Sequence, residues 1–177
     1  MRAYLVLLIA SLSAVAQPFA PEPEIPGAFY RLDAGQLVPL ERRDAAFRNT
    51  STGFMVMTMK TVLEVPGNRS AVRFKTGQPM QFVVRGPMGF PPGAGSRFLL
   101  HKLSTTKDKR RMVISSGYVT PVHMSNVRDP SRDTVPVEVS PYGAWSDGFM
   151  LVAAPLAAGE YALTMYSGQT LYCFGVD

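Results

Sequence analysis

The sequence has few of the side chains that build metal, redox or disulfide sites. Its 177 residues include one Cys, two His and one Trp. A single Cys cannot form an internal disulfide, which excludes a disulfide-stabilised scaffold. Charged residues make up only 18% of the chain, against 46% hydrophobic residues. This composition excludes a disordered acidic or basic protein, because burial of so many apolar side chains can offset the entropy lost on folding.

The chain is instead rich in residues that make turns. It contains 15 Gly and 15 Pro, distributed along its length. This excludes a coiled coil or a long helical bundle, because Gly and Pro are the poorest helix formers. The length suits one domain with a substantial core. We therefore expect a single globular domain built from short strands and turns.

Residues 1–16 (MRAYLVLLIASLSAVA) have the pattern of a secretory signal peptide. The positively charged Arg2 precedes the apolar segment Leu5–Ala10, and residues 14–16 match an Ala-x-Ala cleavage site. The segment is too short to cross a bilayer as a helix. We expect cleavage before Gln17, no transmembrane segment in the mature protein, and a location in the periplasm or outside the cell.

The mature chain is predicted to consist of a short tether and one domain. Residues 17–27 (QPFAPEPEIPG) contain four prolines, which favour an extended tether. The domain, residues 28–177, begins with a β-hairpin in which Ala28–Leu32 and Gln36–Leu40 flank an Asp-Ala-Gly turn. Glu41–Arg48 is the one stretch predicted to form a helical turn.

Turn residues divide the rest of the domain into short strands. No long amphipathic helix is present to cover a parallel sheet, and this pattern is typical of an antiparallel sandwich or barrel. The sequence therefore predicts an all-β fold, a single antiparallel β-sandwich. The remaining strands are expected at 54–65, 70–74, 80–85, 97–104, 111–119, 134–139, 149–153, 160–166 and 170–176, with a long loop at Gly86–Ser96.

Residues 156–161 (LAAGEY) resemble the corner that leads into the penultimate strand of immunoglobulin-like sandwiches. The matching residues are Leu156, Gly159 and Tyr161, and in that family the Tyr hydroxyl caps backbone groups of the preceding turn. Paired cysteines, as in antibody domains, are absent. Three further segments resemble ones that recur in uncharacterised exported bacterial proteins: Phe29–Leu32, Arg97–Arg111 and 159–177. Together these resemblances imply an exported bacterial immunoglobulin-like β-sandwich, and they imply no activity.

The predicted strand at 54–65 places several methionines on one face. A period of two puts Met55, Met57 and Met59 on the same side as Leu63 and Val65. We expect this face to point into the core, where Met commonly fills gaps. The alternative is a Met-based copper-binding protein, because thioethers bind Cu(I).

Catalytic signatures are absent from the sequence. It contains no serine-hydrolase, zinc-protease, phosphate-loop, dinucleotide or Cys-x-x-Cys motif. His101 is interpreted as a strand residue and His123 as a loop residue. A glycosidase needs two carboxylates opposed across a sugar, for which Glu64, Glu138 and Asp147 are the candidates. We expect no cofactor and favour a protein that is not an enzyme. The alternative is a hydrolase whose active site is not visible in the sequence.

Three surfaces are candidates for binding a partner. The basic run at 107–111 is interpreted as a solvated hairpin tip, with an anionic partner as the alternative. Aromatic residues in two loops could stack on a sugar or a protein. The candidate residues are Lys107, Lys109, Arg110 and Arg111 in the basic run, Phe90 in the loop Gly86–Ser96, and Tyr142 and Trp145 in Pro141–Gly148.

The sequence thus favours an exported β-sandwich that acts as a non-enzymatic binding or structural module of the bacterial envelope. Its partner would be an envelope protein or a glycan. Nucleic acid is not expected as a partner, because the protein is predicted to be exported and its net charge is small. The charge is +5 for the full chain and +4 once the signal peptide, with Arg2, is cleaved. Cys173, in the apolar run Leu171–Val176, is interpreted as a small buried hydrophobe, with a reactive thiol as the alternative.

Overall fold

The computed structural model describes residues 20–53, 57–86, 98–120, 123–127, 133–143, 145–165 and 169–177. No helix long and apolar enough to cross a membrane occurs in these residues. The strands are β1 (Phe29–Asp33), β2 (Gln36–Pro39), β3 (Glu41–Asp44), β4 (Ala46–Thr52), β5 (Met57–Pro66), β6 (Arg73–Phe74), β7 (Met80–Arg85), β8 (Phe98–Thr105), β9 (Lys109–Thr120), β10 (His123–Val127), β11 (Thr134–Val135), β12 (Val137–Pro141), β13 (Gly148–Ala153), β14 (Gly159–Met165) and β15 (Thr170–Val176).

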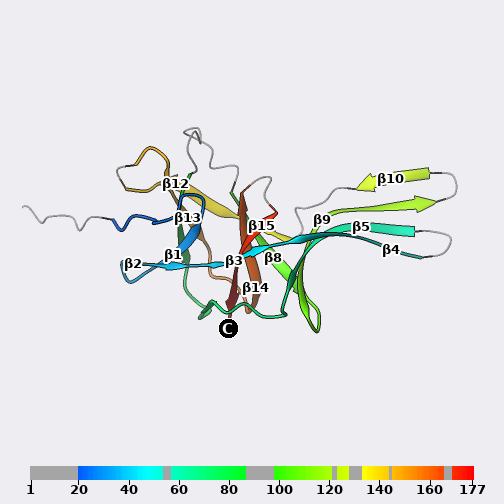
Figure 1. Ribbon diagram of the computed structural model, residues 1–177, viewed down its shortest axis with the longest axis horizontal. Helices are drawn as coiled ribbons and strands as arrows, with labels where there is room; N and C mark the ends of the chain where they lie inside the picture. The colour runs from blue at the N-terminus through cyan, green and yellow to red at the C-terminus, as the bar shows by residue number, and fades with distance from the viewer. Residues whose placement is uncertain are drawn as a thin grey trace, which may run out of the picture.

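The strands form two sheets (Figure 1). The smaller sheet has the order β12-β13-β7-β1-β2, and the main path of the larger sheet is β3-β15-β14-β8-β9-β5-β4. On the larger sheet β10 pairs with β9, β11 with β8 and β6 with β15. Only the short β6 runs parallel to its neighbour among the described pairs. The predicted all-β fold with antiparallel sheets is confirmed, and the two sheets pack as a β-sandwich.

The predicted hairpin at the start of the domain is present. Strands β1 and β2 pair antiparallel, with Asp33 opposite Gln36. Ala34 and Gly35 form the turn with φ angles of 47° and 80°, both in the left-handed region. Two such residues are what a tight hairpin turn requires, and Gly adopts this conformation without steric cost. The Asp-Ala-Gly signal in the sequence therefore placed the hairpin correctly.

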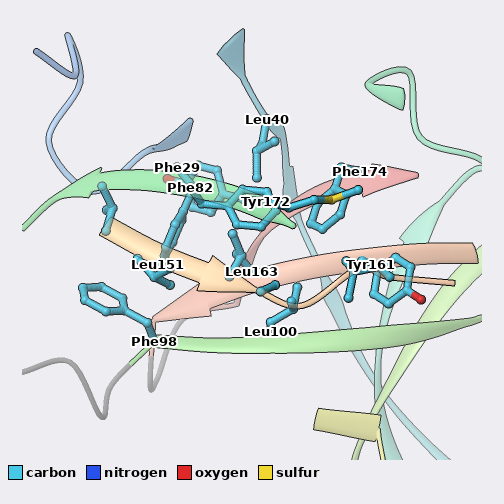
Figure 2. Close-up of a cluster of buried hydrophobic side chains, with 14 of the residues drawn as sticks. Phe29, Leu40, Phe82, Phe98, Leu100, Leu151, Tyr161, Leu163, Tyr172 and Phe174 are labelled. Carbon is cyan, nitrogen blue, oxygen red and sulfur yellow. The ribbon is translucent and has the colours of Figure 1, made fainter. Parts of the chain in front are cut away.

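The main core lies between the two sheets and is built around aromatic rings. The ring centres of Phe82 on β7 and Phe174 on β15 are 5.0 Å apart, so they join the smaller sheet to the larger one. Phe29 on β1 meets Tyr172 on β15 in the same way, at 5.1 Å. Figure 2 shows these rings gathered with Leu151 and their aliphatic neighbours. Large rings bury the most apolar surface, so these contacts dominate the cohesion of the sandwich.

A second, smaller apolar cluster lies on the other face of the larger sheet. Because side chains alternate along a strand, Ala162 and Cys173 face away from Leu163 and Phe174. Cys173 is fully buried in this cluster and is a free thiol. Burial raises the pKa of the Cys173 thiol to about 12. A buried, protonated thiol is a poor nucleophile, which agrees with its interpretation as a small hydrophobe.

Two local predictions are wrong. Glu41–Arg48, predicted as a helical turn, forms β3 and the beginning of β4. β3 pairs with β15 and β4 with β5, and these ladders override the weak helical preference of a short charged run. His123, interpreted as a loop residue, begins β10, which pairs with β9.

Four strands of the larger sheet extend beyond the sandwich as a projecting arm. Here the arm denotes residues 46–52, 57–61, 115–120 and 123–127, which belong to β4, β5, β9 and β10. Figure 1 shows these strands running side by side away from the rest of the molecule. The pairing order across the arm is β10-β9-β5-β4, which leaves β4 and β10 at its edges. Every residue of β4 is exposed.

The arm corrects the expectation that the methionines of β5 point into the core. Met57 and Met59 are 40% and 43% exposed, whereas Leu63 and Val65 are buried. The predicted alternation is right, since these residues share one face of β5, but only the end near Val65 reaches the second apolar cluster. The alternation of apolar residues could not reveal that β5 extends beyond the residues that cover its buried end. Met55 lies outside the described residues.

Candidate functional site

The basic run is divided between the two faces of β9. Lys107 is exposed in the turn before the strand. Lys109 and Arg111 lie on one face and reach Glu64 on β5, with Nζ and Nε at 3.2 and 2.7 Å from its carboxylate oxygens. Arg110 points to the other face and is 1% exposed. The interpretation as a solvated hairpin tip therefore suits Lys107 and is wrong for Arg110, which the sheet covers.

Arg110 is the centre of a buried ion network. Its Nη1 lies 3.0 Å from Glu41 Oε2 and 3.8 Å from Glu160 Oε2. Its Nε and Nη2 also donate to the backbone carbonyls of Gly67 and Pro66, at 3.1 and 3.3 Å. One side chain thus connects β3, β9, β14 and the segment after β5. Such a closed set of partners holds the fold together and leaves no charge on Arg110 for a ligand.

Glu41 is held in its ionised form by this network. Burial alone would raise its pKa, but hydrogen bonds from Arg110, Ser70 and Arg43 outweigh burial and lower the pKa to about 2. Ser70 contributes its hydroxyl to Glu41, and its backbone N–H donates to Glu160 at 2.8 Å. The carboxylates of the network are therefore occupied by donors from the protein itself.

The network reaches the surface at a shallow hollow of about 380 Å³ beside β14. Arg73 contacts both Glu160 and Asp177, and Arg69 contacts Asp177 at 3.0 Å. Lys102 also lines the hollow. Two of the three cations that line the hollow are therefore already paired with carboxylates, which leaves little positive charge for a ligand.

A different kind of hollow, a groove of about 370 Å³, lies at the base of the arm, where the arm joins the sandwich. It lies across β4, β5, β9 and the end of β8. Hydroxyl groups, cations and two valines line it, and Lys60 and Arg111 supply the charge. The lining residues are Thr50, Thr52, Thr58, Lys60, Val62, Ser104, Arg111 and Val113.

Alternation along the strands explains how the groove forms. Thr58 and Lys60 share one face of β5 with Val62, and Thr52 and Thr50 lie directly opposite them on β4. On β8, Ser104 shares its face with Phe98 and Leu100, which are buried in the main core. The groove is thus the continuation of the inner face of the larger sheet beyond the point where the smaller sheet covers it.

The predicted aromatic loop at Pro141–Gly148 is partly built into the fold. Tyr142 is buried, and its hydroxyl donates to the carbonyl of Pro21 at 3.1 Å. Trp145 is half-buried, with its ring centre 6.2 Å from that of Tyr142. The N-terminal segment is also held by the ion pair between Glu22 and Arg85 at 2.6 Å. Tyr142 therefore anchors residues 20–27 to the smaller sheet. Phe90 lies outside the described residues.

The corner at residues 156–161 has the geometry that its sequence suggests. The Tyr161 hydroxyl donates to the carbonyl of Ala157 at 2.9 Å. Leu156 is buried in the main core, and Gly159 has a φ of 156°, a backbone conformation that residues with a side chain rarely adopt. Burial raises the pKa of Tyr161, which keeps its hydroxyl protonated as a donor. The bond from Tyr161 to Ala157 and the burial of Leu156 fix the segment that leads into β14.

The candidates for catalysis lie apart. Glu64 is on β5 of the larger sheet, Glu138 on β12 of the smaller sheet, and Asp147 pairs with Arg85 in the turn before β13. His101 is buried in β8, and burial lowers its pKa. No group of three or more His, Cys, Asp or Glu side chains that could hold a metal ion occurs among the residues described above.

Sequence reasoning missed two features of the site. It did not identify Glu41 and Glu160 as the partners of Arg110, because they are far apart in the chain and become neighbours only through strand pairing. It also missed Lys60 and Thr58, although the alternation of Thr and Lys along two adjacent strands was a usable signal for the groove.

The chain matches no known protein-family model and no curated protein.

Proposed function

We propose that the protein is an exported, non-enzymatic binding module of the bacterial envelope, with an immunoglobulin-like β-sandwich as its scaffold. The pattern of residues 1–16 supports export through a cleaved signal peptide. The bond from the Tyr161 hydroxyl to Ala157 supports the immunoglobulin-like assignment, since that family has a Tyr hydroxyl bond of this kind at the corner before its penultimate strand.

The projecting arm is the observation that carries the binding function. A strand that contributes to a core has at least one face covered by other residues. In contrast, β4 is exposed along its full length. The arm also exposes Phe47, Met57 and Met59, which are 53%, 40% and 43% accessible. Large exposed apolar side chains and an open sheet edge are typical of surfaces that bind other molecules. The arm therefore presents a binding surface that the sandwich holds away from its own core.

The proposal is tested by expressing the full chain in a bacterium and fractionating the cells. We expect the exported protein to begin at Gln17 and to sediment saturably with washed envelope fragments. A variant with both arm faces altered, Phe47→Glu with Lys60→Glu, is expected to lose binding by about tenfold or more. The matched control is Val38→Glu with Lys75→Glu, which alters exposed residues outside the arm. Equal sedimentation of the two variants, or recovery only from the cytoplasm with residues 1–16 intact, would overturn the proposal.

A copper-binding function is the second candidate, because the exposure of Met57 and Met59 leaves their thioethers accessible on one face of β5. Titration with Cu(I) under reducing conditions tests it. If these thioethers are ligands, Met57→Leu with Met59→Leu weakens Cu(I) binding by about tenfold or more, while Met80→Leu, in the core, leaves it unchanged. Equal affinity of all three proteins removes this candidate.

A further inference from the structure

We propose that the groove on the arm binds an acidic saccharide, a polyhydroxylated ligand that carries carboxylate or phosphate groups. This inference rests on the envelope-binding function proposed above and names the ligand class for that same arm. Three properties of the groove carry it: an excess of positive charge, a row of hydroxyl groups and an open, ligand-sized shape.

The positive charge around the groove exceeds what the protein itself neutralises. Arg48, Lys109 and Arg111 surround the single carboxylate of Glu64, at 3.8, 3.2 and 2.7 Å. Burial alone would raise the pKa of Glu64, but the hydrogen bond from Lys109 and the neighbouring positive charges outweigh burial and keep it ionised.

Lys60 adds a further cation on the same face of β5, and it has no ion-pair partner within the described part of the chain. This side of the sheet thus carries four cations beside one carboxylate, Glu64, so the surface around the groove has an uncompensated positive charge. A multiply charged anion is complementary to such a surface.

The hydroxyl groups indicate that the anion is a sugar. Thr52 pairs with Thr58 across β4 and β5, and Thr50 pairs with Lys60. These residues place neutral hydroxyls beside the cation, and Ser104 adds another from β8. The hydroxyls of Thr50 and Ser104 donate to the backbone carbonyls of Lys60 and Arg111, at 3.5 and 3.2 Å, so they offer a ligand their acceptor lone pairs. A hydroxyl group both donates and accepts hydrogen bonds, which suits a ligand with many hydroxyls of its own. A simple inorganic anion would need the cations alone.

The shape of the groove is consistent with this ligand. Its volume of about 370 Å³ is in the range of small-molecule sites. Val62 and Val113 add apolar surface on which the C–H face of a sugar ring can pack. Proteins that bind single-stranded nucleic acid stack bases on aromatic rings, and the described lining of the groove contains none. An acidic saccharide therefore fits better than a nucleic acid.

The experiment measures binding of the purified protein to polygalacturonate, with the fully methyl-esterified polymer as an uncharged probe of the same backbone. We expect saturable binding to the acidic polymer only, weakened by salt. Lys60→Glu should weaken it about tenfold or more, and Thr58→Val several-fold. Lys75→Glu, which makes the same charge change at an exposed site outside the arm, should leave the affinity within twofold. Circular dichroism and urea unfolding verify that each variant is folded.

The outcomes separate this inference from the function on which it rests. Sedimentation with envelope fragments but no binding to polygalacturonate overturns the saccharide assignment and leaves the binding module standing. If the protein binds a single-stranded oligonucleotide as tightly as polygalacturonate, and Lys60→Glu abolishes both, the groove binds polyanions in general and the saccharide assignment is overturned. Equal losses with Lys60→Glu and Lys75→Glu overturn the groove as the site. Failure to bind either envelope or polymer overturns both proposals.

Discussion

Arg110→Met is expected to destabilise the protein by about 3–5 kcal/mol, a large part of the stability of a typical domain. The substitution keeps most of the side-chain volume and removes the charge. Glu41 and Glu160 would then remain in the sheet without their shared cation, and the carbonyls of Gly67 and Pro66 would each lose a donor. Urea unfolding monitored by circular dichroism measures the change in the free energy of unfolding.

Lys107→Met is the matched control, because it removes a neighbouring exposed cation and should change stability by less than about 0.5 kcal/mol. The pH dependence gives a second readout. The pKa of Glu41 is lowered from 4.5 to about 2 in the folded protein. Its contribution is therefore complete above pH 4.5 and is lost as the pH falls toward 2. Arg110→Met should flatten this loss. A loss of stability below about 1 kcal/mol would contradict the central role of Arg110.

Phe174→Ala is expected to cost about 3–5 kcal/mol through the cavity it leaves in the main core. Phe174 is fully buried, and its ring centre lies 5.0 Å from that of Phe82 and 5.6 Å from that of Tyr161. Removing the ring opens a space between the two sheets that rigid strands cannot close. Thermal and urea unfolding measure the loss.

Phe47→Ala is the matched control because it removes the same ring from an exposed position on the arm. Phe47 is 53% exposed, so the change in stability should be below about 0.5 kcal/mol. This contrast also examines the arm itself. If Phe47→Ala destabilised the protein as much as Phe174→Ala, the arm would be part of the core and its exposed residues would need another explanation.

The parts of the fold that sequence reasoning placed correctly depend on local patterns. The β1–β2 hairpin follows from an Asp-Ala-Gly turn between two apolar runs, and β15 was placed within its observed bounds, Thr170–Val176. Both signals are contained within a few residues. The helical prediction for Glu41–Arg48 failed because its local preference is weak, and the pairing that decides its structure comes from other strands, β15 at the end of the chain and β5.

The candidate site shows the same limit. The basic run was visible, but its division into a buried Arg110 and a Glu64-bound pair depends on carboxylates from β3, β5 and β14. Tyr142 was identified as an aromatic loop residue, yet its hydroxyl bond to Pro21 could not be read from a residue more than 100 positions away. Contacts of this kind exist only after the chain has folded.

The sequence by itself determined that the chain forms strands and turns around an apolar core, because alternation, Gly and Pro act through nearest neighbours. It also determined which residues of β5 share a face. Only the tertiary structure decided which part of each strand is covered, because coverage depends on where the opposing sheet ends. On the inner face of the larger sheet, that boundary opens the groove beside Lys60. On the opposite face, the second apolar cluster covers Leu63 and Val65 but leaves Met57 and Met59 exposed.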